Sequence, residues 1–286
     1  MSETIVVAGA TGYIGRHVVE ALDSRGCRVR ALVRSQKRAE SPGPFGAPPL
    51  RGHVAEWRIV DYTDPTTLLD ACEGADRVVS ALGVTRQNAS PWDIDFIGNL
   101  RLLEDAERHA VASFLYVNVL HCHSGTSLTM RSKHAFSETL RRSRVAAQIV
   151  NPSGYFSDVT DFLFMARRGF GFTLGDGAAK INPIHGADLA EFIVDHLGEP
   201  SMSWDIGGPD ILSYRELEEL AFRIAGRRQR ILRIRPVILR PLQWAADRSS
   251  PRLSNLTRFF LESLQVDAVG APTGQRRIEP FLRAVR

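Results

Sequence analysis

The sequence has 286 residues, of which 44% are hydrophobic and 24% are charged, and its net charge is +4. These values are typical of a globular protein, and no apolar run reaches the roughly 20 residues that are needed to span a membrane. Because the arginines accompany no nucleic-acid motif and the three cysteines have no metal-ligand spacing, we expect a cytoplasmic protein that binds no nucleic acid, no membrane and no metal.

Strand-like and helix-like segments alternate through the first half of the chain. Short apolar, β-branched runs predict strands at residues 4–8, 28–33, 56–60, 77–81, 113–118 and 146–150. Apolar residues at helical spacing predict helices at residues 14–24, 65–71, 94–110 and 132–143. Such strict alternation predicts an α/β fold of the Rossmann type, a doubly wound parallel sheet with helices on both faces.

The alternation loosens after residue 151. The segments predicted there are a glycine-rich stretch at 169–177, a strand at 204–206, and helices at 187–197 and 214–225. We expect a NAD(P)-binding Rossmann domain at residues 1–150 and a smaller, substrate-binding C-terminal lobe at residues 151–286. The role of residues 226–286 and the oligomeric state stay open.

A glycine-rich turn separates the first predicted strand from the first predicted helix. Gly9 permits a sharp turn, Gly12 lets the backbone approach a diphosphate, and Gly15 lets the helix pack against the strand. The amide groups that begin the helix then face the phosphates with the positive end of the helix dipole. The pattern in this position predicts a dinucleotide site. Its expected contacts are Gly9, Thr11, Gly12, Tyr13, Ile14 and Gly15.

The end of the second predicted strand indicates which dinucleotide binds. An acidic residue there would bond the ribose 2′-hydroxyl of NAD, but this sequence has Arg34, with Arg16 behind the third glycine and Lys37 nearby. Guanidinium groups bind phosphate through paired hydrogen bonds, whereas a carboxylate would repel it. We therefore expect NADP(H) in preference to NAD(H). The alternative is that these arginines are solvated surface residues.

Several motifs occur together between the N-terminus and residue 225. They are GATGYIG at 9–15, LVR at 32–34, VDYTDPTTL at 60–68, SALG at 80–83, FLYVNVL at 114–120, NPSGYFSD at 151–158, INPIHGADLAEFI at 181–193 and WDIGGPDILSYREL at 204–217. With these motifs the chain resembles the atypical and extended short-chain dehydrogenase/reductases, including their NmrA-like and divinyl-reductase-like branches. It is also similar to the ketoreductases of antibiotic-pathway aromatic polyketides, such as those acting on angucyclinones.

The resemblance implies cofactor contacts beyond the glycine turn. Asp61, with Tyr62 beside it, would reach the adenine amine, although Asp61 could equally cap the helix that follows. The ribose and nicotinamide side would be lined by Ala81, Leu82 and Gly83, and the nicotinamide amide by Pro152, Ser153 and Tyr155.

The proton donor that the resemblance implies is absent from this sequence. The family pattern is a Tyr-x-x-x-Lys pair with a serine at the end of the fifth strand. Here the fitting lysine, Lys133, has Thr129 at the tyrosine position, and Asn118 replaces the serine. A threonine hydroxyl is too weak an acid to protonate an alkoxide by itself, whereas the amide of Asn118 can polarise a carbonyl.

Three proton sources stay open. They are a water held by Thr129 and Asn118, a histidine such as His121 or His123, and an acidic hydroxyl of the substrate itself. Both histidines could equally face solvent, and Lys133 could simply bond the ribose hydroxyls of the cofactor. The candidate catalytic residues are therefore Lys133, Asn118, Thr129 and His121.

Aromatic residues are frequent in the second half, at Tyr155, Phe156, Phe162, Phe164, Phe170 and Phe172. A wide apolar pocket would suit a large, flat small-molecule substrate, although ordinary core packing also explains such residues. The leading hypothesis is NADPH-dependent reduction of a ketone on a bulky, aromatic, polyketide-type molecule. The alternatives are reduction of a carbon–carbon double bond or a quinone, as divinyl-reductase-like relatives imply, and non-catalytic redox sensing, since NmrA-like proteins bind the dinucleotide without catalysis.

Overall fold

The computed structural model describes residues 2–84 and 89–285 of the chain. The chain divides into two compact units. Unit 1 comprises Met1–Asn118, Ser132–Asn151 and Gly186–Trp204, and unit 2 comprises Val119–Arg131, Pro152–His185 and Asp205–Arg286. Both units therefore contain segments from either side of residue 150, where the sequence predicts a domain boundary.

An eight-stranded sheet has the order β12-β9-β6-β5-β4-β1-β2-β3. Its strands are β1 (Thr4–Ala8), β2 (Arg28–Val33), β3 (Glu56–Ile59), β4 (Arg77–Ser80), β5 (Ser113–Val117), β6 (Ala146–Pro152), β9 (Met202–Gly207) and β12 (Ala271–Pro272). The central strand β1 pairs in parallel with β2 and β4, so that Val6 lies opposite Arg30 on one side and Val78 on the other. The order from β3 to β6 is that of a Rossmann fold, which confirms the predicted architecture.

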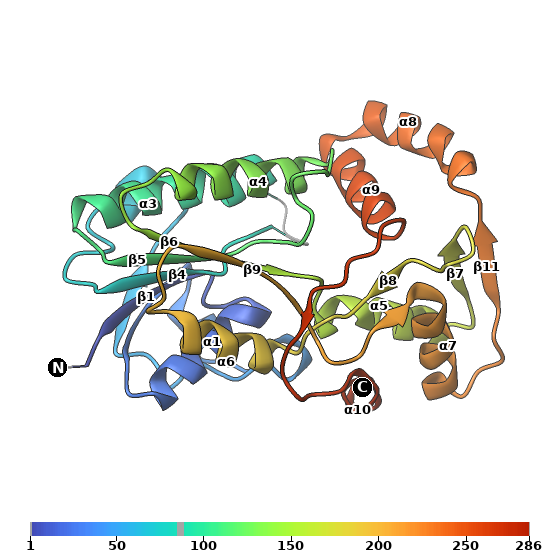
Figure 1. Ribbon diagram of the computed structural model, residues 1–286, viewed down its shortest axis with the longest axis horizontal. Helices are drawn as coiled ribbons and strands as arrows, with labels where there is room; N and C mark the ends of the chain where they lie inside the picture. The colour runs from blue at the N-terminus through green and yellow to red at the C-terminus, as the bar shows by residue number, and fades with distance from the viewer. Residues whose placement is uncertain (1, 85–88, 286) are drawn as a thin grey trace. The chain divides into compact units, whose positions relative to one another are not determined.

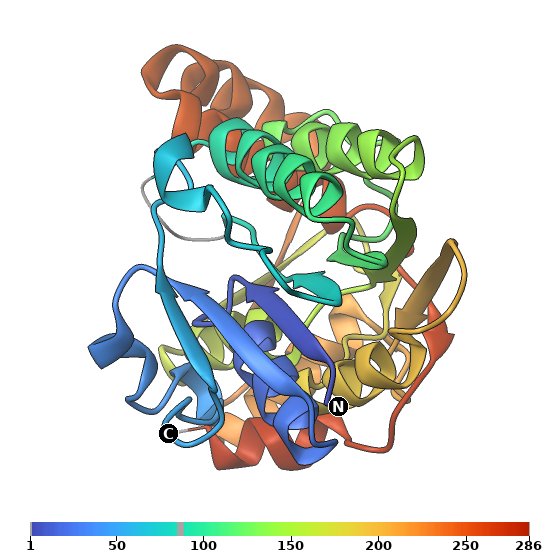
Figure 2. The same ribbon diagram turned by 90° about the vertical axis from the view of Figure 1, so that its left-hand side faces the viewer.

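Helices cover both faces of the sheet within unit 1. Figure 1 shows α3 (Asn99–Arg108) and α4 (Leu128–Arg141) on one face and α1 (Tyr13–Ser24) and α6 (Gly186–His196) on the other, and Figure 2 shows α3 and α4 on the same side in the turned view. Since helices lie on both sides, β1 is buried on both, with Ile5, Val6 and Val7 fully inaccessible to solvent. No helix in residues 2–84 and 89–285 has both the length and the apolar character that crossing a membrane requires.

One hydrophobic core of unit 1 lies between the sheet and helices α3 and α4. Tyr116 on β5 is its largest fully buried side chain, and it meets the ring of Phe136 from α4 edge-on, with ring centres 4.7 Å apart. Phe114, on the same face of β5, packs against Phe136 as well. Each such ring contributes about 2–3 kcal/mol of apolar burial, which fixes the approach of α4 to β5.

Two predicted helices of unit 1 differ in the structure. The segment predicted to be helical at 65–71 forms only the short 3-10 helix η2 (Pro65–Leu68), because Asp70 has a positive φ of 56° that no helix can continue through. The segment predicted at 94–110 begins as a π-helical turn, η3 (Trp92–Gly98), before it continues as α3. Two further short helices, α2 (Gln36–Ala39) and η1 (Pro44–Gly46), lie in the loop after β2.

Unit 2 has a smaller core around two packed helices, α5 (Phe156–Arg167) and α7 (Tyr214–Ala225). A capping box of Ser213 and Glu216 begins α7, and Gly226 ends it with a φ of 63°. Phe156 is fully buried against Phe281 and His185, so it belongs to this core and not to an open pocket wall. The other elements are β7 (Gly171–Leu174), β8 (Lys180–Ile181), β10 (Leu212–Ser213), β11 (Ile231–Ile234), η4 (Pro236–Leu239), α8 (Arg240–Ser249), α9 (Pro251–Ser263) and α10 (Ile278–Ala284).

Glu218 on α7 is a fully buried carboxyl group inside this core. Its Oε1 accepts a hydrogen bond from the Phe172 amide at 3.1 Å. Its Oε2 lies so close to the backbone of Gly171 that a Cβ atom on Gly171 would be only 2.3 Å from it. Within the described part of the chain no donor reaches that Oε2. Burial raises the pKa of Glu218 from 4.5 to about 7. The folded state therefore binds this proton more tightly than the unfolded state does, and stability falls as pH rises from about 4.5 through 7.

We expect Glu218→Gln to stabilise the protein at pH 8.5 by up to about 3 kcal/mol, because the amide keeps the bond to Phe172 and carries no charge to bury. Near pH 4 the two proteins should differ little. Urea unfolding at both pH values measures the difference, and Glu219→Gln, at the neighbouring partly exposed position, is the control. An equal difference at both pH values would contradict the prediction.

Candidate functional site

The turn between β1 and α1 is built around two glycines that no other residue can replace. Gly9 has a φ of 71°, and a Cβ there would lie 2.5 Å from the carbonyl oxygen of Ala81 at the end of β4. A Cβ on Gly15 would lie 2.2 Å from the carbonyl oxygen of Gly9. The Gly12 amide donates to that same oxygen at 3.0 Å and closes the turn. The chain therefore passes directly from the strand into the helix, as the sequence predicts.

Helix α1 begins with its amide end uncovered by acidic or capping groups. Gly12 is the N-cap residue, and among the described residues no side chain caps it and no acid lies in the first turn. Thr11 and Gly12 are exposed at this end. Because the first amides of a helix lack partners within the helix and lie at the positive end of its dipole, this turn suits an anion such as a diphosphate. The geometry fits a dinucleotide.

Two tyrosines support this turn from within the protein. The hydroxyl of Tyr62 accepts a hydrogen bond from the Gly9 amide at 3.2 Å, and burial raises the pKa of Tyr62 so that it stays neutral. The hydroxyl of Tyr13 accepts a hydrogen bond from the amide of Gly186, the first residue of α6, at 3.1 Å. Both were predicted to touch the cofactor, and both hydroxyls bond the protein backbone here.

Arg16, which the sequence suggests as a phosphate contact, bonds the protein backbone in this structure. It is only 4% exposed, and its guanidinium donates to the carbonyl oxygens of Thr11, Arg38, Ala39, Ser41 and Pro48 at 2.7–3.2 Å. These bonds hold the loop after β2 against α1. These bonds occupy most of the guanidinium donors, and a contact of Arg16 with the 2′-phosphate stays a prediction.

Arg34 and Asp61, at the ends of β2 and β3, are exposed. Asp61 accepts hydrogen bonds at Oδ1 from the hydroxyl and the amide of Thr63, at 2.7 and 2.9 Å, and these bonds hold the pKa of its carboxyl below the usual range. The nearby positive charge of Arg34 acts in the same direction. The helix that follows is capped by Asp64 and not by Asp61, which leaves the proposed adenine contact as the prediction for Asp61.

Lys133 lies on α4 beside two side chains that the sequence did not single out. Its Nζ is 3.0 Å from Oδ1 of Asp95, which is fully buried on η3, and 3.4 Å from the hydroxyl of Tyr116 on β5. Lys133 itself is 13% exposed. A Cβ on Gly83 would lie 3.2 Å from that Nζ, so the ammonium sits directly against the backbone that follows β4. A cationic donor is therefore fixed at the carboxyl-terminal edge of the sheet.

The strand end next to Lys133 is held by a chain of buried hydrogen bonds. Ser80, the last residue of β4, donates to Oδ1 of Asn99 at 2.6 Å, and Asn99 donates to the backbone carbonyl of Asp95 at 2.9 Å. The Leu82 amide donates to the Ser80 hydroxyl at 3.3 Å, and the Ala81 amide bonds Ala8 on β1. The backbone at 81–83, where the resemblance implies ribose contacts, is thereby tied to η3.

Asn118, at the end of β5, bonds a neighbouring strand. Its Nδ2 donates to Oδ1 of Asn151 at 2.8 Å, and Nδ2 of Asn151 donates to the hydroxyl of Ser203 at 3.0 Å. Asn118 is only 2% exposed. One hydrogen of the Asn118 side-chain amide therefore binds Asn151 of β6. Polarising a substrate carbonyl would use the other hydrogen of that amide.

Thr129 and His121 belong to unit 2, where the C-terminal region supplies their partners. Asn255 on α9 donates to the Thr129 hydroxyl at 3.0 Å and accepts from its amide at 2.9 Å. Nε2 of His121 lies 3.1 Å from the carbonyl oxygen of Asp267, which makes this nitrogen a donor. Glu262 accepts bonds from the amides of Thr126 and Ser127. Residues after 226 therefore order this loop.

The remaining predicted contacts lie at the end of β6 and the start of α5, in unit 2. The Ser153 hydroxyl donates to the carbonyl of Asn182 at 2.5 Å, and its amide donates to Ile206. Tyr155 is the N-cap residue of α5 and forms a bridge with Ile184, while Pro152 is buried as the last residue of β6.

A protein-family model matches most of this chain. The model of a family described as NAD(P)H-binding matches residues 9–200, which include the glycine turn, Arg34, Asp95 and Lys133. The chain belongs to this NAD(P)H-binding family. The match confirms the predicted binding of a nicotinamide dinucleotide at the level of NAD(P)H. The residues that contact it stay a prediction.

Relatives of this NAD(P)H-binding protein include reductases. It is 28% identical over 261 residues to a chloroplastic divinyl chlorophyllide a 8-vinyl-reductase of Zea mays, a match that covers 85% of this chain and 65% of the relative. It is 26% identical over 229 residues to a mitochondrial NADH dehydrogenase [ubiquinone] 1 alpha subcomplex subunit 9 of Arabidopsis thaliana, covering 76% of this chain and 56% of that one. The chain thus spans less than two thirds of the length of these relatives.

Among solved structures, the NADPH complex of the quinone oxidoreductase QOR2 from Escherichia coli matches with a TM-score of 0.75. The match covers 97% of this chain and 98% of that chain at 15% sequence identity. At this identity the likeness is evidence for the fold alone.

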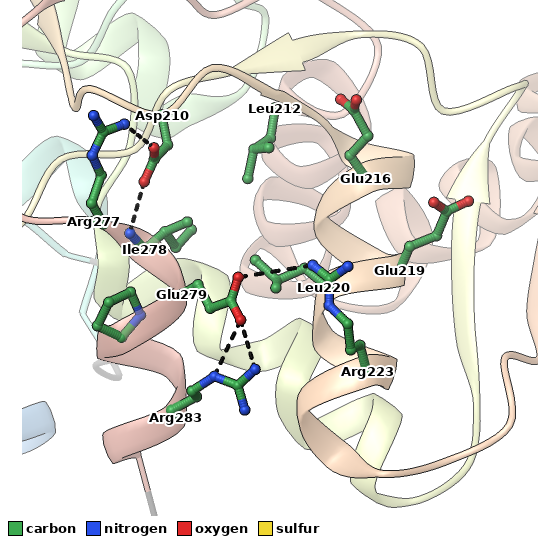
Figure 3. Close-up of a pocket in the computed structure, with 11 residues that line it drawn as sticks. Asp210, Leu212, Glu216, Glu219, Leu220, Arg223, Arg277, Ile278, Glu279 and Arg283 are labelled. Atoms are coloured by element: carbon green, nitrogen blue, oxygen red, sulfur yellow. Dashed lines mark hydrogen bonds and ion pairs between the residues drawn. The ribbon is translucent and has the colours of Figure 1, made fainter.

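A separate groove of about 730 Å³ lies in unit 2 between α7 and α10 (Figure 3). Several of its charged groups pair with one another: Arg277 bonds Asp210, and Arg283 and Arg223 both approach Glu279. Its lining residues are Asp210, Leu212, Glu216, Glu219, Leu220, Arg223, Arg277, Ile278, Glu279, Pro280 and Arg283. None of the predicted site residues lines this groove.

Proposed function

We propose that the protein is an NADPH-dependent reductase that converts a ketone on a bulky, aromatic, polyketide-type small molecule into an alcohol. The observation that carries the proposal is the Lys133 ammonium, fixed by Asp95 against the backbone of Gly83. Reduction of a ketone develops negative charge on an oxygen, and a preorganised cation beside that oxygen stabilises the charge strongly. NADPH, when bound, supplies the hydride.

Several residues of this chain would bind the cofactor and the substrate oxygen. The amides that begin α1 would bind the diphosphate, and Arg34 would bind the 2′-phosphate that distinguishes NADPH from NADH. Lys133 would bind the nicotinamide ribose or the substrate oxygen, and its ammonium hydrogens can move to that oxygen. The hydroxyl of Tyr116, 3.4 Å from Nζ, lies next to this donor. An acidic hydroxyl of the substrate would be a further source of the proton.

A second candidate function is reduction of a quinone or of a conjugated carbon–carbon double bond. The name of the similar protein from Zea mays supports it, since that relative is a vinyl reductase. A developing phenolate or enolate would also be stabilised by Lys133. The two candidates differ in the atom of the substrate that receives the hydride.

Isotope transfer distinguishes these candidates. We expect that NADPH carrying deuterium at one face of the nicotinamide C4 transfers it to the carbinol carbon of an aromatic polyketide ketone, as measured by NMR of the product. NADPH labelled on the opposite face is the control and should transfer none. Deuterium on a former alkene carbon, or oxidation of NADPH by quinones alone, would favour the second candidate. Binding of NADPH without turnover of ketones, quinones or alkenes would contradict both and favour a redox sensor.

A further inference from the structure

We infer that Asp95 is a positioning residue that holds the Lys133 ammonium and the backbone at Gly83 and Val84 in one fixed arrangement. Its two carboxylate oxygens contact different partners. Oδ1 lies 3.0 Å from Nζ of Lys133, and Oδ2 accepts a hydrogen bond from the Val84 amide at 2.9 Å. One side chain thus connects the helix that carries the lysine to the loop that follows β4.

Asp95 is the buried member of the ion pair, and Lys133 is the member that solvent can reach. The carboxylate is fully buried, and burial raises the pKa of Asp95, while the Lys133 charge and the Val84 amide act against that rise. A buried carboxylate without such partners would be strongly destabilised. Lys133 is partly accessible at 13%. The lysine can therefore reach a ligand on its open side, while the carboxylate holds it on the closed side.

The backbone of Asp95 is fixed independently of its side chain. It lies in the π-helical turn η3, a type of irregularity that is frequent at functional sites. Its carbonyl accepts a hydrogen bond from Asn99, which in turn accepts from Ser80 on β4. The carboxylate position is thereby tied to the strand that carries the loop, and movement of Asp95 would move both Lys133 and the loop.

Gly83 leaves the space that this arrangement needs. A Cβ at this position would lie 3.1 Å from Oδ1 of Asp95 and 3.2 Å from Nζ of Lys133, which is closer than nine in ten Cβ contacts. Even a methyl group would therefore push against the ion pair itself. Within the described residues of unit 1, the carboxylate of Asp95 from η3 and the hydroxyl of Tyr116 from β5 lie next to the Lys133 ammonium.

The first test follows the lysine directly and needs no substrate. The chain has three lysines, Lys37, Lys133 and Lys180, so protein labelled with ¹³C at lysine Cε gives a signal for each. Loss of one signal in Lys133→Arg assigns it. In Asp95→Asn we expect the titration midpoint of the Lys133 signal to fall by about one pH unit or more, because the largely buried ammonium loses the carboxylate 3.0 Å away. The other two signals should not move.

Controls and alternatives make this test decisive. Asp93→Asn removes an exposed carboxylate from the same turn and should leave every lysine signal unchanged. If Asp95→Asn does not fold, Gly83→Ala replaces it, and its methyl group should shift the Lys133 signal alone. An unchanged Lys133 titration in Asp95→Asn, or an unshifted signal in Gly83→Ala, would overturn the inference.

The consequence for the cofactor rests on the proposed function of Lys133 and is tested separately. NADPH binding is measured by calorimetry for Asp95→Asn, Lys133→Met and the double variant. We expect each single change to weaken binding by about 10-fold, and the double change to weaken it no further than the larger single effect, because both act through one ammonium. If Lys133→Met binds and turns over normally while the NMR shift persists, the proposed role of Lys133 fails and the positioning by Asp95 stands. Fully additive losses would contradict the positioning.

Discussion

Replacing Arg34 by glutamate is expected to weaken NADPH binding by about 100-fold while NADH binding changes by less than about threefold. Arg34 follows directly on the last residue of β2, is exposed, and makes no hydrogen bond or ion pair with any residue in 2–84 and 89–285. Its donors are therefore available to a phosphate, in contrast to those of Arg16. Glutamate would remove two charge-assisted hydrogen bonds to the 2′-phosphate and add a charge that repels it. NADH has a hydroxyl group in place of this phosphate, so its binding is not weakened in either way.

The comparison needs both dinucleotides and one control. Calorimetric titration of each variant with NADPH and with NADH gives the ratio of the two dissociation constants. Arg28→Glu makes the same change of charge at the other, exposed end of β2 and should leave that ratio unchanged. If Arg34→Glu weakens both dinucleotides equally, the charge acts on the fold or on the diphosphate, and the proposed preference for NADPH is wrong.

The sequence was sufficient to predict a parallel, doubly wound sheet because local signals agree with one another in its first strands. Apolar runs in β1 and β2 are buried on both faces, and the glycine turn leaves no space for side chains at Gly9 and Gly15. In unit 2 the signals were weaker. The aromatic residues of α5 suggested a pocket, but Phe156 packs in the core, because period alone does not tell an apolar pocket wall from a helix face that packs on a neighbour.

The partners of the candidate site residues were not predictable, since they come from distant positions in the chain. Arg16 lies just after the glycine turn, which suggests a phosphate contact, but four of its five acceptors are carbonyls that only the folded loop at 38–48 brings to it. Lys133 meets Tyr116 and Asp95 across three different elements. The available signal is that Tyr116 precedes Asn118 by two residues, a spacing that places two side chains on the same face of an extended strand.

Replacing Lys133 by methionine is expected to lower the rate of ketone reduction by about 100-fold or more, the usual cost of removing one donor to a developing oxyanion. Methionine fills a similar volume without a charge. The loss should therefore appear in kcat as well as in KM, because the ammonium interacts more strongly with the charged transition state than with the neutral ketone. Lys133→Arg retains the charge but enlarges the group against Gly83, so its rate should be intermediate.

Steady-state kinetics with saturating NADPH measure these rates, and two further variants show where the effect originates. Lys180→Met removes an exposed lysine from β8 and should change kcat by less than about twofold, as surface substitutions do. Tyr116→Phe removes the hydroxyl 3.4 Å from Nζ but keeps the ring that packs on Phe136. A drop in rate that grows with pH in Tyr116→Phe would indicate that the phenol helps to return a proton to Lys133 after each turnover. A Lys133→Met protein with an undiminished kcat would instead show that the proton and the stabilising charge come from the substrate, since the charge that Lys133 supplies would then be unnecessary.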